Sequence, residues 1–175
     1  MKTSNIACVV AGVVSLMMVH TSRAATPGPD AATPNAIHIT VPVVLKHADV
    51  VFNMDHLAFT ATKLPVGMLY MHLLAMRMKQ NHTSGHIVGV FHGLAAYMLL
   101  NNAAYDKFRG VTTGNPYANS ITTLQKQGVG LEECAFSMSV HHWGNSNLLP
   151  GIQVTTGAVG RIVELSQKGY VQIQP

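Results

Sequence analysis

The sequence predicts one α/β domain, in which helices cover both faces of a mostly parallel sheet. Short apolar runs of strand length alternate along the chain with longer segments that end at glycine, as helices commonly do. Several of the short runs are apolar at nearly every position, which is typical of parallel strands buried on both faces. Regular alternation of strand and helix favours a layered α/β architecture over an all-β or all-α one.

The first half of the chain begins this alternation. Residues 37–45 alternate apolar and polar side chains and predict an edge strand, since Pro42 argues against a central position. Residues 48–55 predict the first buried strand. Residues 64–81 predict a helix with Pro65 in its first turn.

The second half continues it in the same order. Gly128 and Gly169 follow two helical segments and act as C-terminal stops. The further strands are expected at residues 85–93, 129–133, 152–157 and 170–175, and the further helices at residues 94–102, 115–128 and 158–169.

The first 24 residues have the pattern of a secretory signal peptide. Lys2 precedes an apolar run at residues 6–19, and Ser22 and Ala24 occupy the small-residue positions before the expected cleavage site, after residue 24 or 25. The apolar run is shorter than the ~20 residues of a membrane-spanning helix. We therefore expect a periplasmic or secreted protein without stable membrane insertion.

The remainder divides into a tether and one domain. Residues 25–36 are rich in Pro, Ala and Thr and predict a flexible tether, and residues 37–175 predict a single domain with its own core. The formal charge of +4 falls to +2 when Lys2 and Arg23 are removed, and no basic run remains, so nucleic-acid binding is not expected. Only 10% of residues are charged, which weakly favours burial of some surface between subunits.

The mature chain keeps a single cysteine. Cys8 lies within the signal peptide, which leaves Cys134. Exported proteins normally use cysteines in pairs, so a lone cysteine is a free thiol, a metal ligand or half of an intermolecular bond. A buried cysteine that only fills space is the simplest alternative.

Polar residues gather at the predicted carboxyl ends of the strands, where parallel sheets place their functional groups. His82 and His86 precede a strand and are expected at the opposite rim. The strand ends and the loop after the third carry Asn53, Asp55, His56, His92, Gly93, Cys134, His141, His142 and Trp143.

Cys134 is expected at a junction between a strand and a helix. Backbone N–H groups at a helix start favour a thiolate, as would a nearby imidazolium, and the imidazole of His92 is expected to orient the thiol or adjust its reactivity. Glu132 and Glu133 would oppose it, but side chains alternate along a strand, so at most one of them shares its face. A thiolate can accept sulfane sulfur as a persulfide and pass it on, with no cofactor and no second cysteine.

Three segments resemble the DsrE/DsrF-like family: "FHGLAAYMLL", "LQKQGVGLEECAFSM" and "LLPGIQVTTGAVGRIVELSQKGYVQIQP". Together they extend the resemblance over residues 48–175. It implies a flavodoxin-like three-layer fold, assembly into trimers or hexamers, and a sulfur-relay function with persulfide on one cysteine. Cys134 matches that cysteine and His92 the family's His-Gly position. The sequence departs from the family at "AFS", where a small polar turn is expected, and at "VHHWG".

The resemblance implies an exported sulfur carrier or sulfurtransferase that acts in sulfur-compound metabolism without a cofactor. Its partners would be donor and acceptor proteins or small sulfur compounds. Two other functions stay open. Cys134, His92, His141 and His142 offer a soft sulfur and nitrogen set suited to copper or zinc. A non-catalytic oligomeric scaffold is the other.

Overall fold

The computed structural model describes residues 37–175, so the predicted signal peptide and tether lie outside the described residues. Residues 43–175 form one compact unit. No helix within the described part of the chain is long and apolar enough to cross a membrane.

A five-stranded sheet with every strand parallel to its neighbour forms the centre of this unit, which confirms the predicted fold class. The spatial order is β4-β3-β2-β1-β5. The strands are β1 (Val50–Met54), β2 (Ile87–Phe91), β3 (Gly130–Cys134), β4 (Gln153–Thr155) and β5 (Val171–Ile173). The three inner strands have almost no exposed residues, as expected for a sheet covered on both faces.

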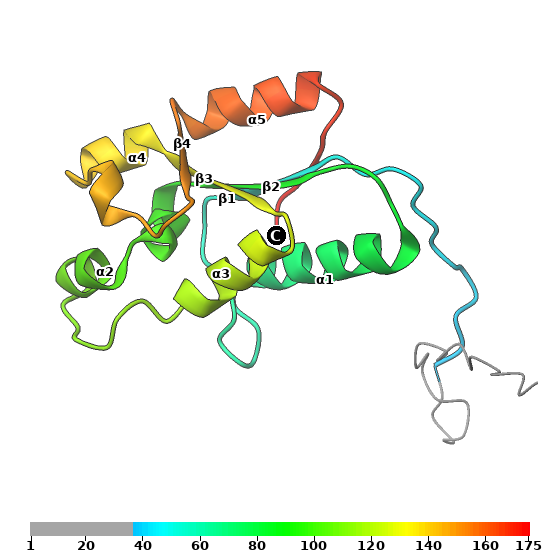
Figure 1. The fold of residues 1–175 in the computed structure, drawn as a ribbon, viewed down its shortest axis with the longest axis horizontal. Helices are drawn as coiled ribbons and strands as arrows, with labels where there is room; N and C mark the ends of the chain where they lie inside the picture. The colour runs from blue at the N-terminus through cyan, green and yellow to red at the C-terminus, as the bar shows by residue number, and fades with distance from the viewer. Residues whose placement is uncertain (1–36) are drawn as a thin grey trace, which may run out of the picture. The chain divides into compact units, whose positions relative to one another are not determined.

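Helices form the outer layers (Figure 1). The helices α1 and α3 lie below the sheet in that view, and α5 lies above it. The α-helices are α1 (Val66–Asn81), α2 (Asn102–Arg109), α3 (Ala118–Lys126), α4 (Ala135–Val140) and α5 (Ala158–Gln167), and the 3₁₀ helices are η1 (Gly93–Leu99) and η2 (Asn145–Asn147).

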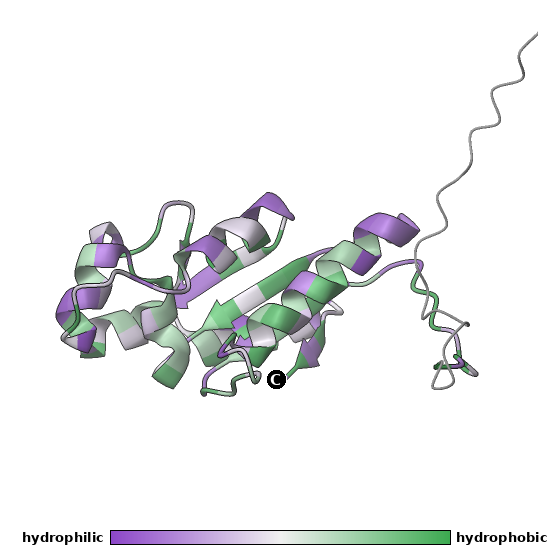
Figure 2. Ribbon diagram, turned by 90° about the horizontal axis from the view of Figure 1, so that it is seen from below, coloured by the Kyte–Doolittle hydropathy of each residue, from purple (hydrophilic) through white to green (hydrophobic). Residues whose placement is uncertain are grey.

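Two hydrophobic cores lie on opposite faces of the sheet. The larger includes Phe52, Phe91 and Met71 and is covered by α1 and α3. Helix α1 appears largely green in Figure 2 and turns purple at its end, where it leaves this core. The smaller core, beneath α5, contains Val51, Val90 and, unexpectedly for a functional thiol, Cys134.

Three details differ from the sequence prediction. Residues 37–45 form no strand, and Ile39 and Val41 are exposed there. The expected helix at 94–102 is instead the 3₁₀ helix η1 followed by α2, which begins where the Asn101 side chain accepts the Ala104 N–H at 3.0 Å. Helix α4 was not predicted as a separate element, because its six residues are too few for a periodic pattern.

Candidate functional site

One pocket opens at the carboxyl edge of the sheet, where β1, β2 and β3 end. It has a volume of about 740 Å³. Cys134, His92, Asp55 and His141 all line it, together with the first turn of α5. The structure thus brings the sequence-predicted Cys134 and His92 to a single pocket.

Cys134 is the last residue of β3 and directly precedes α4. Only 4% of its surface is exposed, and its side chain contacts the small core under α5. The thiol therefore lies at the floor of the pocket, and a reagent must enter the pocket to reach it.

Hydrogen-bond donors surround the sulfur. The Ala158 N–H, at the start of α5, donates to Cys134 Sγ at 3.3 Å. Burial raises the pKa of this thiol, but the N–H groups of Ser137, Ala158 and Phe136 and the Ser137 hydroxyl together outweigh burial, so the pKa lies below its usual value. Two helix starts thus stabilise the thiolate without any cationic side chain.

Ser137 also connects the cysteine to the turn after β2. Its Oγ accepts the Gly93 N–H at 3.1 Å. Gly93 has a φ of +55°, and a Cβ there would meet the Asp55 carbonyl oxygen at 3.0 Å. The His-Gly pair at this turn therefore requires glycine, because a side chain would be both strained and crowded.

His92 begins a chain of hydrogen bonds that ends on a carboxylate. His92 Nε2 lies 2.7 Å from Asn53 Oδ1, the Asn53 amide donates to Gln174 Oε1 at 2.5 Å, and the Gln174 amide donates to Asp55 Oδ1 at 2.6 Å. Because each amide oxygen can only accept, His92 Nε2 must donate its proton. In the neutral ring this leaves Nδ1 as a proton acceptor.

Burial also decides the charge of His92. It lowers the pKa of the imidazole, and attraction to the Asp55 carboxylate offsets only part of that effect. The ring is therefore neutral near pH 7. Any effect of His92 on Cys134 near pH 7 therefore comes from hydrogen bonding and orientation, and not from a positive charge beside the sulfur.

Replacing His92 by alanine is expected to slow alkylation of Cys134 by iodoacetamide severalfold at pH 7. The pocket loses its neutral base and the anchor of Asn53, while the N–H groups around the sulfur remain. Intact-mass measurement of alkylation over time tests this. His86→Ala, at the opposite rim, is the matched control and should leave the rate unchanged. Equal rates for His92→Ala and the parent protein would show that His92 only supports the turn.

The two glutamates before the cysteine lie on opposite faces of the sheet, as strand alternation predicts. Glu132 lies on the same face as Cys134 but is paired with Arg161. The Arg161 Nε and Nη2 donate to its carboxylate at 2.8 and 2.7 Å. Glu133 lies on the opposite face of the sheet, the face of the larger core, and is fully buried. Its Oε1 accepts the Cys134 N–H at 3.1 Å, and Oε2 has no partner among residues 37–175.

The two histidines that follow α4 differ in their position relative to the pocket. His141 lines the pocket and stacks on Trp143 with ring centroids 4.6 Å apart, and both rings contact Phe108. His142 has a φ of +57° and does not line the pocket. Within residues 37–175, no three His, Cys, Asp or Glu side chains are placed to hold a metal ion. The structure therefore does not assemble the copper or zinc set considered from the sequence.

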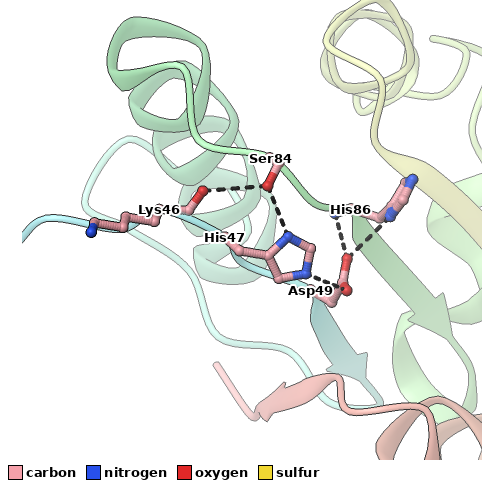
Figure 3. A network of polar contacts seen from close by, with 5 residues as sticks. All are labelled: Lys46, His47, Asp49, Ser84 and His86. Carbon is pink, nitrogen blue, oxygen red and sulfur yellow. Dashed lines mark hydrogen bonds and ion pairs between the residues drawn. The ribbon is translucent and has the colours of Figure 1, made fainter.

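The opposite rim carries a separate polar network (Figure 3). His47 bridges Ser84 Oγ at 2.9 Å and Asp49 Oδ2 at 2.8 Å, and His86 donates its backbone N–H to Asp49 Oδ1 at 2.8 Å. The hydrogen bond from His47 is the largest contribution that lowers the pKa of Asp49. This network anchors the segment before β1 to the segment before β2, at the rim where His86 was expected.

Sequence reasoning missed Ser137 and the Ala158 N–H as neighbours of the thiol. Ser137 follows Cys134 by three residues, a spacing at which a side chain at a helix start can reach back, so it offered a signal. The contact with Ala158 joins residues 24 positions apart and leaves no mark in the sequence.

Comparisons with known proteins find similarity at the level of the fold and no match at the level of the sequence. No protein-family model matches the chain, and no curated protein sequence matches it significantly. Among solved structures, it is similar to MTH1491 of Methanobacterium thermoautotrophicum, described as a protein of unknown function. That match has a TM-score of 0.56 and 21% identity, and it covers 73% of this chain and 99% of that one.

A second solved structure, the YchN protein of E. coli, matches with a TM-score of 0.44 and 12% identity over 73% of this chain and 99% of that one. At these identities the comparisons concern architecture alone. The likeness to MTH1491 therefore supports the predicted fold, a flavodoxin-like sandwich with an all-parallel sheet of five strands.

Proposed function

We propose that this protein is an exported sulfur carrier that holds sulfane sulfur as a persulfide on Cys134. The observation that carries the proposal is the thiol itself. It lies at the floor of a pocket, its pKa is lowered by backbone N–H groups, and Ala158 donates to its sulfur at 3.3 Å. A thiolate of this kind is the nucleophile that sulfur transfer needs.

The chemical step needs no cofactor. The Cys134 thiolate attacks the outer sulfur of a donor R–S–SH. An Sγ–S bond forms, the S–S bond of the donor breaks, and R–S⁻ leaves with the electron pair. The product on the protein is Cys134–S–SH. In this proposal His92, as a neutral base with a free Nδ1, orients the thiol and takes up its proton.

The proposed setting is the periplasm or the extracellular space, and the proposed assembly is a trimer or hexamer. Exposed apolar side chains away from the pocket, such as Leu73 and Met76 on α1, support self-association, since a monomer leaves them in water. Light scattering at micromolar concentration tests the assembly, and a monodisperse monomer would contradict it.

The experiment for the function is intact-mass analysis after exposure to a panel of sulfane-sulfur donors, including inorganic polysulfide, thiosulfate and an organic trisulfide. We expect mass gains that include steps of about 32 Da, each one added sulfur atom, and their removal by a thiol acceptor. Cys134→Ser is the control and should gain nothing. A parent protein that gains no sulfur from any donor would refute the proposal.

A further inference from the structure

The pocket above Cys134 contains no Lys or Arg side chain on its wall. Asp55 supplies its one carboxylate, and the imidazoles of His92 and His141 are its only nitrogen-bearing side chains. Since burial lowers the pKa of His92, that ring contributes no positive charge near neutral pH. The wall therefore offers no permanently charged cation that would attract an anion.

The mouth of the pocket is apolar. Leu94 from η1, Phe136 and Val140 from α4, and Val159 from α5 line it, and each is between 57% and 73% exposed. We call these four side chains the collar. Side chains of this kind in water are unfavourable unless something apolar covers them, so the collar selects for a ligand with an apolar body.

Backbone N–H groups are the remaining source of positive potential. The first turn of α5 lines the pocket from Ala158 to Gly160, but the Ala158 N–H already donates to Cys134 Sγ. The thiolate thus occupies the favourable end of the helix. A dianion entering the pocket would meet the charges of the thiolate and of Asp55 with no Lys or Arg side chain to offset them.

From this we infer that the sulfur donor of Cys134 is an uncharged organic polysulfane, R–S–S–S–R with an apolar R, and that oxyanions such as thiosulfate are excluded. The inference rests on the proposed carrier function and specifies its substrate class. In the step, Sγ attacks the central sulfur and an Sγ–S bond forms. One S–S bond breaks, and R–S⁻ leaves with the electron pair and takes a proton from water. Cys134 then holds –S–S–R, which retains the sulfane sulfur.

The test compares diallyl trisulfide with thiosulfate at equal concentration and pH 8, where an unperturbed imidazole is uncharged. Intact-mass measurement gives the rate of adduct formation on Cys134 for each reagent. The same two rates in urea-unfolded protein correct for intrinsic reactivity. For each state we take the ratio of the trisulfide rate to the thiosulfate rate. We expect this ratio to be at least about tenfold higher in the folded protein than in the unfolded chain, because a tenfold ratio needs only a modest electrostatic difference.

Two lysine variants separate local charge from total charge. Val159→Lys places a cation on the collar and should raise the thiosulfate rate severalfold, an effect that added salt should reduce. Val171→Lys adds the same charge at an exposed valine at the start of β5, away from the pocket, and should leave both rates unchanged.

The outcomes are distinct. If the folded and the unfolded protein prefer the trisulfide equally, or if the folded protein reacts faster with thiosulfate, the inferred substrate class is wrong. Neither result contradicts the carrier function. If Cys134 reacts with iodoacetamide but takes sulfur from neither reagent nor from polysulfide, the carrier function itself fails, and the substrate class with it.

Discussion

Glu133→Gln is expected to stabilise the protein by up to about 3 kcal/mol at pH 7. Burial raises the pKa of Glu133 from 4.5 to about 9, and Oε2 has no partner among the described residues. At about 1.4 kcal/mol per pH unit, keeping this group protonated between pH 4.5 and 7 costs about 3 kcal/mol. Glutamine keeps the oxygen that accepts the Cys134 N–H and removes the titration.

The sign of the pH dependence follows from the same values. Below pH 4.5 both the folded and the unfolded protein hold the proton, so Glu133 costs nothing there. As the pH rises from 4.5 towards 9, the unfolded chain releases a proton that the folded chain keeps, and stability falls. Urea unfolding of both proteins at pH 4.5, 7 and 8 should show an advantage of Glu133→Gln that grows with pH.

Glu132→Gln is the matched control, with the opposite expected sign. Glu132 accepts two hydrogen bonds from Arg161 and is 4% exposed, so neutralising it leaves the partly buried guanidinium with only the exposed Glu164 carboxylate, at 2.9 Å, as a charged partner. We expect a loss of about 2 kcal/mol at pH 7. Equal losses for both variants would mean that Glu133 is ionised in the folded protein and has a partner outside residues 37–175.

Ala158→Pro is expected to lower the rate of Cys134 alkylation at pH 7 about tenfold. Ala158 is the first residue of α5, where proline fits a helix best, and Gly157 before it is already extended, with φ −171° and ψ 134°. The backbone before α5 therefore accepts proline, but the proline Cδ takes the place of the hydrogen that points at Sγ, so the Cys134 side chain must also turn away from the helix start. A hydrogen bond to a charged group contributes about 1.5–3 kcal/mol, so the thiol pKa should rise by about one unit or more.

The measurement is the alkylation rate of Cys134 by iodoacetamide as a function of pH. The parent protein should react with a midpoint below the usual value for a thiol, since its pKa is lowered, and Ala158→Pro should move the midpoint upwards. Ala158→Gly keeps the N–H and should react like the parent. Coincident profiles for all three proteins would show that the helix start of α5 does not stabilise the thiolate.

The sheet was predictable because its strands carry their own signal. The apolar runs at β1, β2 and β3 need burial on both faces whatever surrounds them, and glycine marked the ends of α3 and α5. The edge strand predicted at residues 37–45 is wrong for the opposite reason. Alternation shows that a segment suits a strand, but pairing depends on a free edge that the sequence does not reveal.

The site was predictable only in part. The carboxyl-edge rule brings Cys134 and His92 to one rim, because both end strands of a parallel sheet. The charge of His92 depends on its burial, and the direction of its proton depends on a hydrogen-bond chain that runs from residue 53 to residue 174. Both are products of packing between distant segments and cannot be deduced from local sequence.

The recessed position of Cys134 also determines its fate in an oxidising compartment. A disulfide needs two sulfurs about 2 Å apart, and the collar keeps the folded surface of a second copy from reaching a sulfur at the pocket floor. The Cys134 thiol is thus protected, without a reducing agent, from forming a disulfide with Cys134 of a second copy. If Cys134 carries sulfur as proposed, the same geometry requires an acceptor protein to present its thiol on a slender, protruding segment.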